Sequence, residues 1–91
     1  MNKFNIQKQP VDYLLETAEK FKALRKTKKW SQAEMAERSG VSLGSLKRFE
    51  TTGQISFSSL LQLAHVLDRL QDFETIFEKK TTRDLSNLFS E

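Results

Sequence analysis

The segment from Ser31 to Glu50, SQAEMAERSGVSLGSLKRFE, restricts the fold more than any other part of the chain. Ser31 can cap a helix, and Glu34 stands three residues later, in the spacing of a capping box. Gly40 is placed to end that helix, because glycine readily adopts the left-handed conformation that follows a helix C-terminus. Ser42 can cap the next helix. The segment therefore predicts two short helices joined by a tight turn, a helix-turn-helix.

The residues before this segment also favour a helix. Pro10 suits a first helical turn, where the missing N–H costs nothing. Leu14, Ala18, Phe21 and Arg25 then recur at the spacing of one helical face. Only three glycines and one proline interrupt the 91 residues, and the apolar residues do not alternate as in a strand. These patterns predict a mostly helical chain.

Two more helices are expected after the central pair. A fourth helix begins at Ser56 or Ser58, and its apolar side carries Leu60, Leu63, Ala64, Leu67 and Leu70. The spacing of Phe73, Ile76 and Phe77 predicts a short fifth helix. The expected fold class is therefore all-α, with five helices.

The length of the chain corresponds to a single domain. We assign the helical domain to residues 10–78, with an N-terminal arm at 1–9 and a C-terminal tail at 79–91. If the tail became helical, one of its faces would carry Leu85, Leu88 and Phe89. We expect the tail, or the Phe4–Ile6 stretch, to dock onto another chain. The alternative for the tail is a frayed terminus.

Arg25 is unusual because it lies on the apolar face of the first helix. A buried charge is costly unless it is paired, and Glu50, on the inner face of the third helix, is the best-placed carboxylate. The sequence therefore predicts a structural ion pair between Arg25 and Glu50, which would fix the orientation of the two helices. The alternative is that the Arg25 side chain extends to solvent.

The charge distribution points to an anionic partner. The net charge is +3, and residues 16–30 hold six basic residues against two acidic ones. A basic face attracts phosphate, although a lysine-rich helix surface is often only solvated.

The chemistry of enzymes and metal sites is missing from the sequence. There is no cysteine, and His65 has no second histidine to share a metal with. No nucleophile with a base and no glycine-rich phosphate loop is present. We therefore expect no enzyme, no cofactor and no metal. With neither a signal peptide nor a membrane span in the sequence, we expect a cytoplasmic protein.

Residues 21–70 resemble the helix-turn-helix domain of the lambda-repressor, Cro and XRE family of DNA-binding proteins. The resemblance lies in Arg25, Ser31–Ala36, Gly40, the Ser42–Glu50 helix and Gly53. It implies an internal pair between Arg25 and Glu50. It also implies a transcription regulator that binds a double-stranded DNA operator as a homodimer, with its third helix in the major groove.

The resemblance further implies which residues contact DNA. Gln32 would contact a backbone phosphate, and the third helix would present Ser42, Leu43, Gly44, Ser45, Lys47 and Arg48. Two features depart from the family. Leucine and glycine stand where the family usually has polar side chains, and residues 51–56 lack the basic residues that often hold phosphate in relatives.

Gly44 has two explanations. Glycine within a helix costs roughly 1 kcal/mol relative to alanine. Its missing side chain either lets the helix approach DNA closely or relieves a crowded crossing near Ala33 or Ala36. In the first case, Leu43 could touch a thymine methyl group, and Lys47 or Arg48 could bind guanine; these base contacts have the usual chemistry of the major groove.

The Gly40–Glu50 stretch and the short chain also resemble the small HipB-like antitoxins encoded beside HipA-type kinase toxins. Such a protein neutralises the toxin and represses its own operon, so a HipA-like kinase is an expected partner. Phe73, Ile76 and Phe77 either form the dimer contact or only close the core. The alternative function is a protein-interaction module of the same fold that does not bind DNA, which Leu43, Gly44 and the uncharged loop favour.

Overall fold

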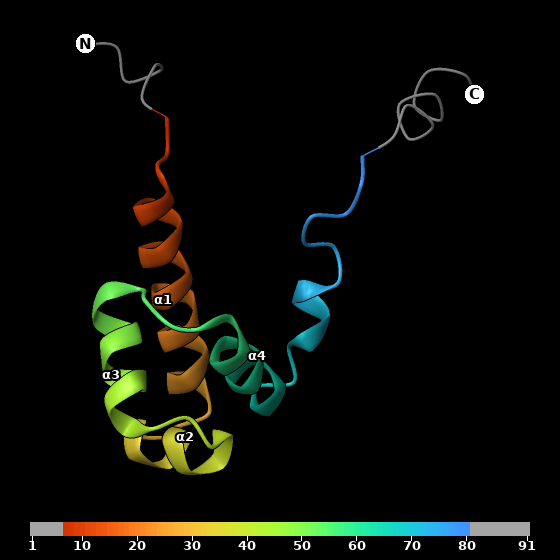
Figure 1. Ribbon diagram of the computed structural model, residues 1–91. Coiled ribbons are helices and arrows are strands. Elements are labelled where there is room, and N and C mark those ends of the chain that lie inside the picture. The colour runs from red at the N-terminus through yellow and green to blue at the C-terminus, as the bar shows by residue number, and fades with distance from the viewer. Residues whose placement is uncertain (1–6, 81–91) are drawn as a thin grey trace.

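The computed structural model describes residues 7–80, and this range contains four α-helices and one short 3-10 helix (Figure 1). The bounds are Pro10–Thr27 for α1, Gln32–Ser39 for α2, Leu43–Thr52 for α3, Phe57–Val66 for α4 and Leu70–Phe73 for the 3-10 helix η2. α1 packs along α3, and α2 contacts both α3 and α4. The all-helical fold agrees with the sequence.

Polar side chains define where the helices begin. The Asp12 carboxylate accepts a hydrogen bond from the Gln9 N–H at 2.7 Å at the start of α1. The hydroxyls of three serines accept a backbone N–H at the starts of α2, α3 and α4, namely Ser31, Ser42 and Ser56. Each hydroxyl thereby satisfies a donor that the helix itself cannot pair. Of the two serines considered for α4, Ser56 is the cap.

Gly40 and Gly53 end α2 and α3 in the same conformation but in different surroundings. Both are left-handed, with φ of 78° and 82°. A Cβ at Gly40 would have no neighbour within 4 Å, whereas a Cβ at Gly53 would lie 2.6 Å from backbone atoms of Leu14. The end of α3 therefore rests directly on the backbone of α1, at a position where only glycine fits.

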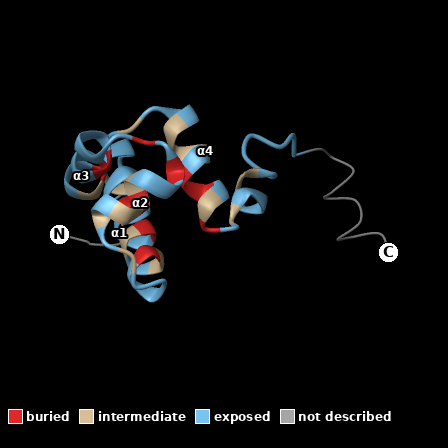
Figure 2. Ribbon diagram, turned by 90° about the horizontal axis from the view of Figure 1, so that it is seen from below, coloured by how far each residue is buried: buried red, intermediate tan, exposed pale blue. Residues whose placement is uncertain are grey.

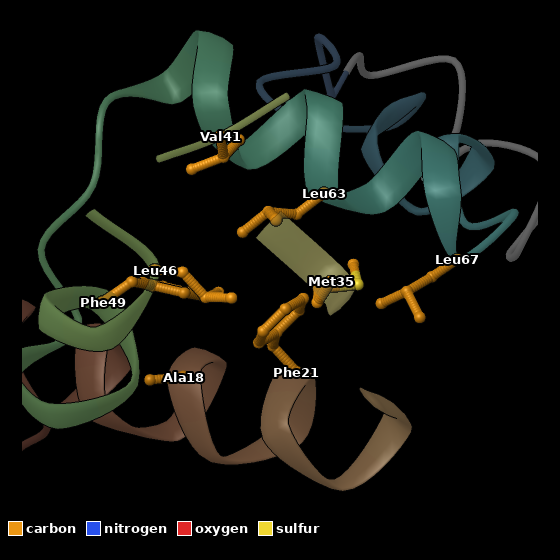
Figure 3. Packing of buried hydrophobic residues seen from close by; sticks show 8 residues of the cluster. All are labelled: Ala18, Phe21, Met35, Val41, Leu46, Phe49, Leu63 and Leu67. Carbon is orange, nitrogen blue, oxygen red and sulfur yellow. The ribbon is translucent and has the colours of Figure 1, made fainter. Parts of the chain in front are cut away.

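The core lies where the four helices meet (Figure 3), and Figure 2 shows the buried residues on their inner faces. Its buried residues are Ala18, Phe21, Met35, Val41, Leu46, Phe49, Leu63 and Leu67. The rings of Phe21 and Phe49 lie 5.4 Å apart and are tilted by 57°, an arrangement that aromatic pairs prefer. The core thus ties α1 to α3 and closes the helix-turn-helix against α4.

The predicted fifth helix is wrong. Only the four residues of η2 are helical there, and Phe73 packs edge-on against Phe57 with 5.9 Å between the ring centres. Ile76 is 46% exposed and Phe77 is fully exposed, with a left-handed φ of 58°. Most helical stability in proteins comes from packing an apolar face. Between residues 7 and 80, no surface covers the side chains of Ile76 and Phe77 in this way. Ile76 and Phe77 therefore do not close the core.

Two predictions concern residues outside the described range. These are the docking predictions for the N-terminal Phe4–Ile6 stretch and for the tail face formed by Leu85, Leu88 and Phe89. Both stay predictions.

Candidate nucleic-acid interface

A buried polar network holds α1, α2 and α3 together. Arg25 donates hydrogen bonds from Nε and Nη2 to the two carboxylate oxygens of Glu50, at 2.7 and 2.9 Å. Its Nη1 donates to the Trp30 carbonyl at 2.8 Å. The side chains of Arg25 and Glu50 are only 8% and 3% exposed. The ion pair that the sequence predicts is therefore present, and Arg25 does not extend to solvent.

Gln32 joins this network from the first turn of α2. Its Nε2 donates a hydrogen bond to Glu50 Oε1 at 2.9 Å. The side-chain amide therefore uses one N–H inside the protein. A carboxamide nitrogen carries two N–H groups, so this bond still leaves a second one for a phosphate.

The turn between α2 and α3 is held by local hydrogen bonds and by one buried side chain. The Gly40 N–H donates to the Ala36 carbonyl at 2.9 Å. The Ser39 hydroxyl accepts the Val41 N–H at 3.1 Å and donates to the same carbonyl at 3.3 Å. Val41 is 4% exposed. The relative position of the two helices is thus fixed by local hydrogen bonds and by one apolar anchor.

The predicted capping box of α2 forms in part. The Ser31 hydroxyl accepts the Glu34 N–H at 3.0 Å. The Glu34 carboxylate, however, pairs with Arg38 at 2.8 Å. The Arg38 guanidinium in turn lies 4.2 Å from the ring centre of Trp30, at cation–π distance. The Glu34 side chain therefore pairs with Arg38 on the exposed surface of α2.

α3 presents most of the predicted DNA-binding residues to solvent. Its buried side chains are Leu46 and Phe49, and the exposed set includes Ser42, Leu43, Gly44, Ser45, Lys47 and Arg48. Residues three and four apart are neighbours on a helix surface, so Gly44, Lys47 and Arg48 share the face opposite the core. The Ser42 hydroxyl is already engaged with Ser45, both with its N–H at 3.1 Å and with its Oγ at 2.9 Å.

The crowding explanation for Gly44 is wrong. A Cβ built on Gly44 would meet no atom within 4 Å. The crossing between α2 and α3 near Ala33 and Ala36 therefore leaves room for a side chain at this position.

A shallow polar groove of about 270 Å³ separates α3 from the start of α4. It is lined by Ser45, Arg48, Gln54, Ile55, Ser56 and Ser59. Arg48 Nη2 donates a hydrogen bond to Gln54 Oε1 across it at 2.7 Å. Sequence reasoning missed Gln54 and Ser59, because nothing in the local pattern shows that they face Arg48.

Basic residues surround the turn between α1 and α2. Lys26, Lys28 and Lys29 are exposed there, and Lys28 Nζ lies 5.9 Å from the ring centre of Trp30. This cluster immediately precedes the Ser31 cap of α2. It adds positive charge beside the helix that carries Gln32.

The described residues provide two further findings on chemistry and location. Between residues 7 and 80, no group of three histidine, cysteine or acidic side chains is arranged to hold a metal ion. None of the helices in that range combines the length and apolar character that crossing a membrane requires.

Comparison with known proteins identifies the family. A family model described as helix-turn-helix matches residues 21–71, which is more than half of the chain. No curated protein and no solved structure matched. The matched range contains α2, the turn, α3, α4 and both members of the Arg25–Glu50 pair. The chain therefore belongs to the XRE and lambda-repressor type of helix-turn-helix proteins, a family of DNA-binding transcription regulators.

Proposed function

We propose that the protein is a sequence-specific DNA-binding repressor that acts in the cytoplasm and reads its operator with α3. The observation that carries the proposal is the outward face of α3, where Lys47 and Arg48 are exposed next to each other. The Arg25–Glu50 pair holds this helix in a fixed orientation relative to α1. A rigid element is needed because base contacts depend on precise placement of a few side chains.

The side chains of α3 fit the chemistry of the major groove. The guanidinium of Arg48 can donate two hydrogen bonds to guanine O6 and N7, and Lys47 can reach the same atoms. Leu43, at 36% exposure, is an apolar side chain suited to a thymine methyl group. In the free protein Arg48 Nη2 donates one hydrogen bond to Gln54. A guanidinium carries five N–H groups, so this bond still leaves donors for a base.

Phosphate contacts would come from the neighbouring elements. Gln32 has a second N–H on its side-chain amide, and the lysines at the turn between α1 and α2 supply positive charge. Such contacts position a protein on the duplex and make binding depend on salt.

We further propose that the protein works as a homodimer and as a HipB-like antitoxin that neutralises a HipA-like kinase toxin and represses its own operon. The Gly40–Glu50 stretch supports the antitoxin subtype. The exposed Ile76 and Phe77 support contact with a second chain. In such a dimer the two α3 helices would lie about one helical turn of DNA apart, on the order of 34 Å.

Replacing Arg48 with alanine tests the role of α3. We expect a loss of roughly 1–3 kcal/mol in binding to the duplex that the wild-type protein selects from a random-sequence pool, with relaxed preference at one base pair. Gln32→Ala should instead weaken selected and scrambled duplexes alike. Fluorescence anisotropy titrations at several salt concentrations measure both effects.

Lys8→Ala is the matched control, because it removes one exposed basic side chain at the opposite end of α1. It should leave the preference for the selected duplex intact. If Arg48→Ala and Gln32→Ala both keep wild-type affinity, α3 is not the reading helix. If the wild-type protein shows no salt-dependent binding to duplex DNA, the fold serves protein interaction instead.

A further inference from the structure

Within residues 7–80, no contact or backbone conformation requires glycine at position 44. Gly40 and Gly53 both have a left-handed φ, and Gly53 also touches the backbone of Leu14. Gly44 shares neither feature: its φ is not left-handed, and the space around its missing Cβ is empty to 4 Å. Glycine nevertheless weakens a helix relative to alanine. The residue thus lowers stability with no compensating contact within the described chain.

Gly44 lies on the same outward face of α3 as Lys47 and Arg48. Gly44 is the second residue of α3 and lies one turn before Lys47 and Arg48 on the outward face. Its neighbour Leu43 is 36% exposed. A molecule that contacts Lys47 or Arg48 from outside therefore also passes over the bare backbone at Gly44.

We propose that Gly44 is a specificity-determining residue at which bound duplex DNA approaches the α3 backbone too closely to leave room for a Cβ. The inference rests on the proposed function. An added methyl group would hold the first turn of α3 away from the groove. It would thereby also withdraw Leu43 and Lys47 from the base edges, since all three residues belong to one rigid turn.

Gly44→Ala separates this role from a structural one, because the two roles predict opposite signs. The variant should melt a few degrees higher than the wild type, since alanine favours the helix. Its affinity for the duplex that the wild type selects from a random pool should fall roughly tenfold or more, the size of effect that one lost base contact produces. The slope of affinity against salt should not change, because no charge is removed.

Gln62→Ala on α4 is the control, since it places alanine at an exposed helical position away from α3. It should keep the wild-type affinity. If Gly44→Ala binds the selected duplex as tightly as the wild type while Arg48→Ala does not, the close approach is refuted and the proposed function stands. If the wild-type protein itself fails to bind duplex DNA, the proposed function fails, and the inference about Gly44 fails with it.

Discussion

Replacing Glu50 with alanine is expected to lower the free energy of unfolding by about 3–5 kcal/mol, the usual cost of removing one partner of a buried ion pair. Glu50 accepts hydrogen bonds from two nitrogens of Arg25 and from the amide of Gln32. Without it, the Arg25 side chain, only 8% exposed, keeps its charge. Among residues 7–80, the Trp30 carbonyl is then its one remaining hydrogen-bond partner. Thermal and urea unfolding followed by circular dichroism measure the loss.

Glu34→Ala is the control for this experiment. The Glu34–Arg38 pair has a comparable distance of 2.8 Å, but its side chains are 43% and 48% exposed. Exposed pairs contribute little, about 0–1 kcal/mol. A melting temperature of Glu50→Ala equal to that of the wild type would show that the pair does not hold α1 against α3.

A second control tests whether the loss of stability in Glu50→Ala comes from leaving the buried Arg25 charge unpaired. Replacing both partners with apolar residues, as in Arg25→Met with Glu50→Leu, removes the buried charge as well as the pair. Such replacements are often neutral or stabilising. The double variant should therefore be more stable than Glu50→Ala alone.

Features set by a few neighbouring residues could be predicted from the sequence. Ser31, Gly40 and Ser42 mark the limits of α2 and α3, because caps depend on local hydrogen bonds and on local backbone conformation. The Arg25–Glu50 pair could be predicted across 25 positions for a different reason. A charge on an apolar face requires a partner, and few carboxylates lie on inner faces.

Features set by tertiary packing could not be predicted. Phe73, Ile76 and Phe77 have helical spacing, but a helix also needs a surface to cover, and the local pattern does not show whether one exists. The spacing around Gly44 likewise permitted a crowded crossing that the folded chain does not have. The hydrogen bond between Arg48 and Gln54 depends on how the chain turns back at Gly53 after the end of α3.

Gly53→Ala is expected to destabilise the domain by roughly 2–5 kcal/mol, through two effects that add. A left-handed conformation costs an ordinary residue about 1–2 kcal/mol, and forcing extra atoms into a packed site costs typically about 1–3 kcal/mol. The new methyl group would lie 2.6 Å from backbone atoms of Leu14. Those atoms belong to α1, so relief would require a shift of the whole helix against α3.

The difference between Gly53→Ala and Gly40→Ala isolates the packing cost, because the two glycines have nearly equal φ values of 82° and 78°. At Gly40 a Cβ meets nothing within 4 Å, so only the conformational cost of about 1–2 kcal/mol applies. Urea unfolding of the two variants under the same conditions gives the difference in their free energies of unfolding. We expect Gly40→Ala to be the more stable of the two. Equal losses would mean that α1 gives way at Leu14 without cost. In that case the fixed orientation of α3, on which its proposed reading of DNA depends, would have to come from the Arg25–Glu50 pair and from the core packing of Phe21 against Phe49.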